Sequence, residues 1–181
     1  MGNLDDVQVG VLLEESFEDL EFHVPRMRLI EEGADVMVLD TGRKEQYEGK
    51  HGLTATPDIE AKNCTHSGID AVVIPGGWAP DKLRRDEGVL ELVRHCYKTD
   101  GKIIGSICHA GWVPVSAGII DGHRVTGSTG IKDDVENAGG TWVDEPAIRD
   151  GSFVFGRVVK DIPNFCREIV NTLQSELTSS N

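Results

Sequence analysis

A cysteine followed at once by a histidine ends an apolar run, in the stretch IIGSICHAGW at 103–112. A thiolate is a nucleophile and an imidazole can carry its proton, so Cys108 and His109 could form a covalent catalytic site. Gly105 and Gly111 would permit a sharp turn from strand to helix, where unpaired N–H groups favour a thiolate. The strict G-x-S-x-G pattern of a nucleophile elbow is absent. The alternatives are a packed cysteine and a hydrogen-bonded histidine at a helix start.

An acidic cluster, EESFEDLE at 14–21, follows the first apolar run. Most of its carboxylates suit the positive end of a helix. Glu21 differs because it lies four residues before Pro25, which has no N–H to donate to the carbonyl of residue 21. We expect a local kink that aims Glu21 toward the edge of a sheet. An ionised carboxylate would raise the pKa of a neighbouring thiol, whereas a protonated one would donate a hydrogen bond to the thiolate and lower it.

A pair of glycines, Gly76 and Gly77, ends another apolar run after Pro75. Their backbone N–H groups, with that of His109, could form an oxyanion hole for a substrate carbonyl. A tight turn that needs positive φ explains the same glycines and is compatible with that role.

Short apolar runs at 7–13, 35–40, 71–77 and 102–108 predict buried parallel strands, because they are continuous in Val and Ile rather than alternating. Amphipathic segments between them predict helices. The first carries Leu20, Val24, Met27 and Ile30 at helical spacing and ends at Gly33; the next two cover about 81–98 and the region up to Ala117. This alternation predicts an α/β fold with a doubly wound, mostly parallel sheet. In such sheets ligands bind beyond the carboxyl ends of the strands, where all three features above fall.

The later part of the chain has a different pattern. RVTG and TWVD predict short strands around an acidic helix near 131–138. PAIRDGSFVFG predicts a hairpin that turns at Asp150-Gly151. Pro163 suits the first turn of a last helix, and the apolar stripe expected on that helix consists of Phe165, Ile169, Leu173 and Leu177.

The whole chain of 181 residues is expected to form a single domain, residues 1–181, with a polar tail at 175–181. Its net charge of −13 disfavours a nucleic-acid-binding surface, because phosphates repel carboxylates. No apolar run has the length of a membrane span, and the first residues lack the basic region of a signal peptide, so we expect a cytoplasmic protein without membrane contact.

The cysteines Cys64, Cys96, Cys108 and Cys166 are scattered, which in the cytoplasm indicates free thiols rather than disulfides. Two pairs, Cys64 with His66 and His95 with Cys96, could ligate a metal, but neither has a second pair at zinc-finger spacing. We therefore expect neither a metal nor another cofactor.

Taken together, these motifs resemble the PfpI/ThiJ superfamily, most closely its PfpI-like intracellular protease branch. The resemblance covers nearly the whole chain. It rests on FEDLE with Pro25, GKHG at 49–52, VVIPGGWAPDKLR at 72–84, SICHAG at 106–111, SAGII at 116–120 and GIKDDVENAGGTWVDE at 130–145.

The resemblance implies a flavodoxin-like fold with helices on both faces of the sheet, a reactive cysteine at Cys108, His109 as its catalytic partner and Glu21 as the carboxyl beside the thiol. Glu18 matches a second acidic position that often lines the pocket. Asp81 matches a carboxylate that completes a triad with the histidine of a neighbouring subunit. Homodimers, or hexamers, are implied as well. The chain departs from the family pattern at Ala110-Gly111-Trp112, at the shorter Asp81 and at Gly156-Arg157.

Three functions remain open at this stage. The first is an enzyme whose Cys108 thiolate attacks carbonyl substrates, either reactive dicarbonyls and their adducts, as in a glyoxalase or deglycase, or peptides. The second is a stress-response redox sensor with an oxidisable Cys108 and little turnover. The third is a chaperone-like module with a vestigial site. We favour small carbonyl substrates, because no extended peptide groove can be inferred. A glutamine amidotransferase is disfavoured by the missing synthetase domain and late His-x-Glu pair.

Overall fold

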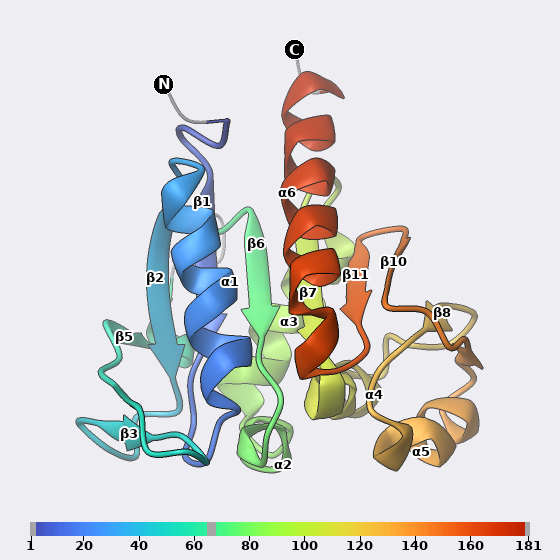
Figure 1. The fold of residues 1–181 in the computed structure, drawn as a ribbon, viewed down its shortest axis with the longest axis horizontal. Helices are drawn as coiled ribbons and strands as arrows, with labels where there is room; N and C mark the ends of the chain where they lie inside the picture. Colours follow the sequence, from blue (N-terminus) through green and yellow to red (C-terminus); the bar gives the residue numbers. More distant parts are fainter. Residues whose placement is uncertain (1–2, 65–67, 180–181) are drawn as a thin grey trace.

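The computed structural model describes residues 3–64 and 68–179, and its centre is a seven-stranded sheet (Figure 1). The strands follow the order β10-β11-β7-β6-β1-β2-β5. Their bounds are β1 Gln8–Leu12, β2 Asp35–Asp40, β5 Ile59–Glu60, β6 Ala71–Ile74, β7 Ile103–Ile107, β10 Ala147–Asp150 and β11 Phe153–Gly156.

All neighbouring strands of this sheet run parallel except the edge hairpin of β10 and β11. The two central strands β6 and β7 are buried along their whole length, which confirms the interpretation of continuous Val and Ile runs. The order reverses direction between β1 and β6, and β7 is the next strand beyond that point. A ligand is therefore expected where the first turns after β1, β6 and β7 meet.

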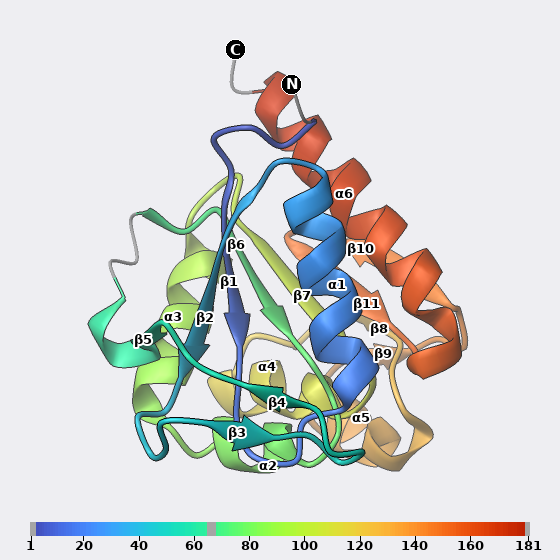
Figure 2. The ribbon, with the colours of Figure 1, turned by 60° about the vertical axis from the view of Figure 1, so that its left-hand side comes forward.

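Helices cover both faces of the sheet, as Figures 1 and 2 show. Helices α1 (Asp19–Glu31) and α6 (Ile162–Ser179) lie side by side on one face, and α3 (Glu87–Lys98) lies on the other with α4 (Trp112–Ala117). The described residues also form short 3-10 helices, among them η1 Ala61–Asn63, η3 Cys108–Gly111, η4 Thr129–Ile131 and η5 Val159–Asp161. None of the helices in the described ranges is both long and apolar enough to cross a bilayer.

Two local expectations in the later helices need correction, the single helix over 81–98 and the buried position of Leu177. The helix expected over 81–98 is two helices, α2 (Ala79–Leu83) and α3, because Asp86 caps a new start by accepting the N–H of Val89 at 3.1 Å. The short strands expected around an acidic helix are confirmed: β8 (Arg124–Val125) and β9 (Thr141–Trp142) form a separate two-stranded sheet around α5 (Lys132–Asn137). Another small sheet joins β3 (Tyr47–Glu48) to β4 (Thr54–Ala55). On α6, Leu177 is 37% exposed, since the helix has run past the sheet by then.

The first helix buries a different face from the one its apolar stripe suggests. Leu20, Val24, Met27 and Ile30 are 39–63% exposed, whereas Glu21, Phe22, Pro25 and Leu29 are buried. Pro25 lies inside the helix, as expected. The helix thus places a carboxyl group inside the protein and leaves apolar side chains outside.

Candidate active site

Cys108 lies in the first position after β7, in a conformation that side chains rarely adopt. Its φ is +62°, and the chain passes directly into the turn η3 and then α4. The left-handed region costs a non-glycine residue about 1–2 kcal/mol. The neighbourhood holds it there, because the Cys108 carbonyl accepts the N–H of Ser128 at 3.2 Å. A Cβ on Gly127 would come within 2.8 Å of the same oxygen.

The His109 ring lies beside the cysteine, so the adjacent residues do meet. Nδ1 of His109 is 3.4 Å from Sγ of Cys108. The rings of Trp78 and Trp112 flank the imidazole at centroid distances of 5.6 and 5.3 Å. Burial, and then the positive charge of Lys50, lower the pKa of His109. The imidazole is therefore neutral near pH 7, and in the tautomer with a bare Nδ1 it can accept the thiol proton.

Glu21 is fully buried next to the sulfur. Its Oε2 accepts the N–H of Gly76 at 2.8 Å, and its carboxyl interacts with the Cys108 thiol. Within the described chain, Oε1 of Glu21 has no hydrogen-bond partner. Burial raises the pKa of Glu21 to about 8, and the negative charge of Glu18 adds to the effect. At pH 7 the Glu21 carboxyl is therefore mostly protonated and can donate to sulfur.

Burial also raises the pKa of Cys108, to about 12, and an ionised Glu21 would add repulsion. The backbone N–H of His109 acts in the opposite direction by hydrogen bonding to the sulfur. The resting sulfur is thus a thiol, and the thiolate has to form by proton transfer to a base during the reaction. Thiol, neutral imidazole and protonated carboxyl together make an uncharged reaction centre at pH 7.

The two glycines after β6 are required for different structural reasons. A Cβ on Gly76 would lie 2.8 Å from the Cys108 Cβ and would also meet the Glu21 carboxylate, so only glycine allows the close approach. Since the N–H of Gly76 already binds Glu21, it is not free for a substrate oxygen. Gly77 has φ +79°, and a Cβ there would come within 2.6 Å of the Ser16 carbonyl. The N–H of His109 is likewise occupied by its hydrogen bond to the Cys108 sulfur, so the amide of Gly77 is left from the predicted oxyanion donors.

A pocket of about 410 Å³ opens over the sulfur. Its lining comes from six segments of the chain: Glu18, Glu21, Lys50, Gly77, Trp78, Cys108, His109, Val158, Val159 and Lys160. Glu18 faces this pocket as predicted, and its Oε2 lies 3.5 Å from Lys50 Nζ and 3.3 Å from His51 Nε2.

Asp81 does not join this group within its own chain. Its carboxylate binds Nη2 of Arg85 at 2.6 Å, one turn further along, and its side chain is 53% exposed. A role toward the His109 of a neighbouring copy stays a prediction.

Sequence reasoning missed the lysines and Trp78 in the pocket wall. Lys50 and Trp78 lie inside the quoted motifs GKHG and VVIPGGWAPDKLR, so attention to every side chain of those motifs would have found them. Lys160 and the two valines before it carry no local signal, because the fold of η5 alone brings them to the pocket.

Metal ligation is not favoured by the donor atoms present. Among the described residues, one group of three potential ligands lies within reach of a single ion, Glu18, Asp19 and His51. Both oxygens of Asp19 already accept backbone N–H groups, from His51 and Leu53. Of the pairs considered from the sequence, Cys64 with His66 includes a residue outside the described ranges. The four cysteines are free thiols, as predicted.

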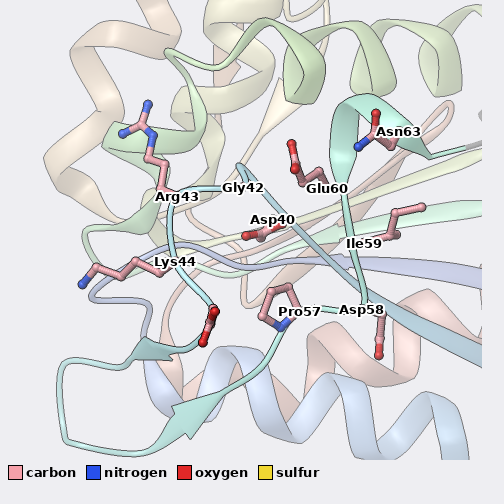
Figure 3. Close-up of a pocket in the computed structure, with 10 residues that line it drawn as sticks. Asp40, Gly42, Arg43, Lys44, Pro57, Asp58, Ile59, Glu60 and Asn63 are labelled. Carbon is pink, nitrogen blue, oxygen red and sulfur yellow. The ribbon is translucent and has the colours of Figure 1, made fainter.

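A second hollow of about 460 Å³ lies beyond β2 and β5 (Figure 3). Asp40 and Glu60 lie between its walls, and the side chain of Lys44 extends outward from the loop. The ten lining residues include no cysteine, serine or histidine, so this hollow has no counterpart of the Cys108-His109 pair.

Residues 7–172 match the DJ-1/PfpI family. The chain belongs to this family. A deglycase of Pyrococcus abyssi is 38% identical over 168 residues, which cover 93% of this chain and all of that protein. General stress protein 18 of Bacillus subtilis is 34% identical over 169 residues, 92% of this chain and 98% of that one.

A solved structure shows the same fold. The two-domain protein of Anabaena variabilis, with a DJ-1/ThiJ/PfpI-like and a ferritin-like domain, matches with a TM-score of 0.89 and 34% identity. The match covers 92% of this chain and 48% of that one, so this chain spans about half of the two-domain protein. The flavodoxin-like α/β fold of the DJ-1/PfpI family is thus confirmed, and the relatives' names support a stress-related enzyme of that family.

Proposed function

We propose that this protein is a cysteine-dependent enzyme that acts on small reactive carbonyl compounds and on the adducts they form with amines. The observation that carries the proposal is the 3.4 Å contact between the Cys108 sulfur and an imidazole held neutral by burial. A nucleophile and a base within reach of each other, in a pocket with a backbone donor for the carbonyl oxygen, are the requirements of covalent carbonyl chemistry. The deglycase names of relatives support the same substrate class.

The first step follows from the resting protonation states. His109 Nδ1 takes the thiol proton while the sulfur lone pair forms a C–S bond to the aldehyde carbon. The carbonyl π electrons move to oxygen, where the amide of Gly77 stabilises the charge, and the imidazolium returns the proton there. The product is a hemithioacetal that keeps every atom of thiol and aldehyde.

For a 2-oxoaldehyde the remaining steps need only protons and one water. A base removes the C–H proton of the hemithioacetal, which is acidic because a ketone is adjacent, and the proton returns to the ketone carbon. The result is a thioester of a 2-hydroxy acid, which water hydrolyses to release the acid and restore the thiol. The aldehyde carbon is oxidised while its neighbour is reduced. Glu21, with a pKa of about 8, and His109 can both exchange these protons near neutral pH.

The deciding experiment is a substrate panel, with methylglyoxal, a methylglyoxal–amine adduct and a peptide, run on wild type and Cys108→Ser. We expect the substitution to reduce kcat/KM for the carbonyl substrates by at least 10³-fold, because a hydroxyl is a far weaker nucleophile near pH 7. Cys166→Ser serves as the control, since that buried thiol lies outside the pocket. Unchanged consumption of all substrates in Cys108→Ser would refute the enzymatic proposal.

A redox role is the second candidate, and exposure of the thiols favours it. Of the four cysteines, Cys108 is partly exposed and the other three are buried. If Cys108→Ser leaves consumption unchanged while mild peroxide adds oxygen to Cys108 alone in wild type, by mass spectrometry, the redox function replaces the enzymatic one.

Self-association is part of the proposal. The exposed stripe on α1, formed by Leu20, Val24, Met27 and Ile30, borders a groove of about 380 Å³ whose lining includes Val24, Ile162 and Pro163. We propose that a second copy of this chain covers the stripe, since two copies related by a two-fold axis present the same apolar surface to each other. Asp81 is the proposed carboxylate partner for the His109 of a neighbouring copy.

A further inference from the structure

Two lysines from separate parts of the chain reach the wall of the Cys108 pocket. Lys50 comes from the loop between β3 and β4, and Lys160 from the turn η5 after β11. In the described part of the chain, Lys160 forms no salt bridge, and Lys50 has one, with Glu18 at 3.5 Å. Neither amine is needed for attack of sulfur on a carbonyl, so their presence calls for a separate explanation.

The loop that carries Lys50 is fixed by its backbone. The N–H of Lys50 donates to the Phe17 carbonyl at 2.9 Å. Asp19, which is 2% exposed, accepts the N–H groups of His51 at 2.9 Å and Leu53 at 2.8 Å. These three bonds anchor the loop to the start of α1, beside the nucleophile. Lys50 is thereby held at the pocket instead of moving freely at a loop tip.

The local charge differs in sign from that of the molecule. With Cys108, His109 and Glu21 uncharged at pH 7, the charged groups that line the pocket are Glu18, Lys50 and Lys160, with a net charge of about +1. The whole chain carries −13. The Nζ of Lys50 also lies 5.8 Å from the centroid of the Trp78 ring, which leaves it at the pocket wall and close to the reaction centre.

We propose that this pocket selects carbonyl substrates that carry an anionic group, a carboxylate or a phosphate, which Lys50 and Lys160 bind while Cys108 attacks the carbonyl. This inference has two halves. The reaction half, that such substrates react at Cys108, rests on the proposed function. The anion half, that the pocket binds an anionic group, rests on the lysines alone. Glu18 competes with the anion for Lys50, so it limits the preference. Lys50 and Lys160 are then specificity-determining residues, and Asp19 is a positioning residue.

The anion half can be tested without turnover. Iodoacetate and iodoacetamide are nearly isosteric and differ in charge, and both alkylate Cys108 through the same atoms. We compare their rate constants at Cys108 by peptide mass spectrometry and normalise the ratio to that of N-acetylcysteine. We expect a normalised preference for iodoacetate of about 10-fold or more, because a hydrogen bond to a charged group contributes that much. This normalised preference should fall at least 3-fold in Lys50→Gln and in Lys160→Gln. It should be retained in Lys50→Arg and should increase in Glu18→Gln.

Lys98→Gln is the matched control, since Lys98 precedes β7 and therefore lies at the opposite edge of the sheet. It should leave the ratio unchanged. A normalised ratio of one or below in wild type, or a ratio that neither lysine substitution lowers, would overturn the inference. A loss of equal size in Lys98→Gln would overturn it too, because the effect would then belong to overall charge.

The reaction half uses a matched substrate pair, 3-phosphooxy-2-oxopropanal and 3-hydroxy-2-oxopropanal, which share one dicarbonyl group. We expect wild type to prefer the phosphorylated compound by about 10-fold in kcat/KM, and Lys50→Gln to lower that preference, measured as the ratio of the two kcat/KM values. Equal turnover of both compounds would overturn the substrate preference and leave the proposed function intact. Selective alkylation without Cys108-dependent turnover would refute the proposed function and leave the anion site.

Discussion

At the scale of single residues, the buried carboxyl group of Glu21 has the clearest effect on the free energy of unfolding. A carboxyl group that is ionised in the unfolded chain above pH 4.5 stays protonated in the folded protein up to pH about 8. Between these two values the folded state binds more protons than the unfolded state, so the free energy of unfolding decreases as pH rises. The loss is about 1.4 kcal/mol per pH unit across that window. The protein keeps this destabilising group beside the Cys108 sulfur, where an acid that can donate to sulfur would serve the proposed reaction.

Glu21→Gln should therefore stabilise the protein in a pH-dependent way. Glutamine can accept from Gly76 and donate toward sulfur, and it does not ionise. The difference in unfolding free energy from wild type should be small at pH 5 and grow by a few kcal/mol toward pH 8, as measured by urea denaturation at several pH values.

Glu91→Gln on the exposed surface of α3 is the control and should show no such slope. In wild type, kcat/KM should also fall above pH about 8, as the Glu21 carboxyl ionises and repels the developing thiolate. A stability difference that shrinks as pH rises would contradict the assignment of a protonated Glu21.

The backbone of Cys108 leads to a second prediction at this scale. Because φ is +62°, alanine at this position keeps the strain of the left-handed region and glycine relieves it. Cys108→Gly should be as stable as Cys108→Ala or up to about 1 kcal/mol more stable, although glycine is normally the less stable of the two. Thermal unfolding of the two inactive variants measures this.

Ala110→Gly, two residues further in the same turn, provides the comparison. Ala110 is fully buried and does not have a positive φ, so its replacement by glycine should lower stability. The quantity to compare is the loss of stability on going from alanine to glycine at position 108 and at position 110. If the two losses are equal, the backbone at Cys108 is not strained.

At the scale of elements, most of the sheet could be predicted from the sequence, because its strands are continuous Val and Ile runs. The four runs at 7–13, 35–40, 71–77 and 102–108 correspond to β1, β2, β6 and β7, and the carboxyl ends of three of these strands bring the candidate residues together. Glu21, Gly76 and Cys108 meet because the first turns after parallel neighbouring strands share one edge.

The parts that could not be predicted depend on tertiary contacts. The break between α2 and α3 depends on the Asp86 cap, a signal that periodicity hides. The loop that presents Lys50 is shaped by the carboxylate of Asp19, more than 30 positions away from it in sequence. The pKa of Glu21 depends on burial, and composition and spacing carry no information about burial of a particular carboxyl.

At the scale of the whole molecule, the inner and outer faces of helix α1 have different surroundings. Its inner face places Glu21 beside the Cys108 sulfur, and its outer face exposes four apolar side chains. A periodic apolar stripe normally marks the face that packs on the sheet. Here the stripe points to solvent, so a partner is needed to bury it, and the same helix would then connect an interface with the active site.

Met27→Glu tests this arrangement, because Met27 is the most exposed of the four at 63%. If a second copy covers the stripe, wild type should sediment as a dimer or larger assembly. The substitution should weaken association at least 100-fold, since it places like charges opposite each other near a two-fold axis. Sedimentation velocity over a concentration series measures this. Leu53→Glu adds the same charge to another apolar side chain, 50% exposed on the β3–β4 loop, and should leave the assembly intact. A wild type that stays monomeric, or an assembly that Met27→Glu does not weaken, would show that two copies do not bury this face.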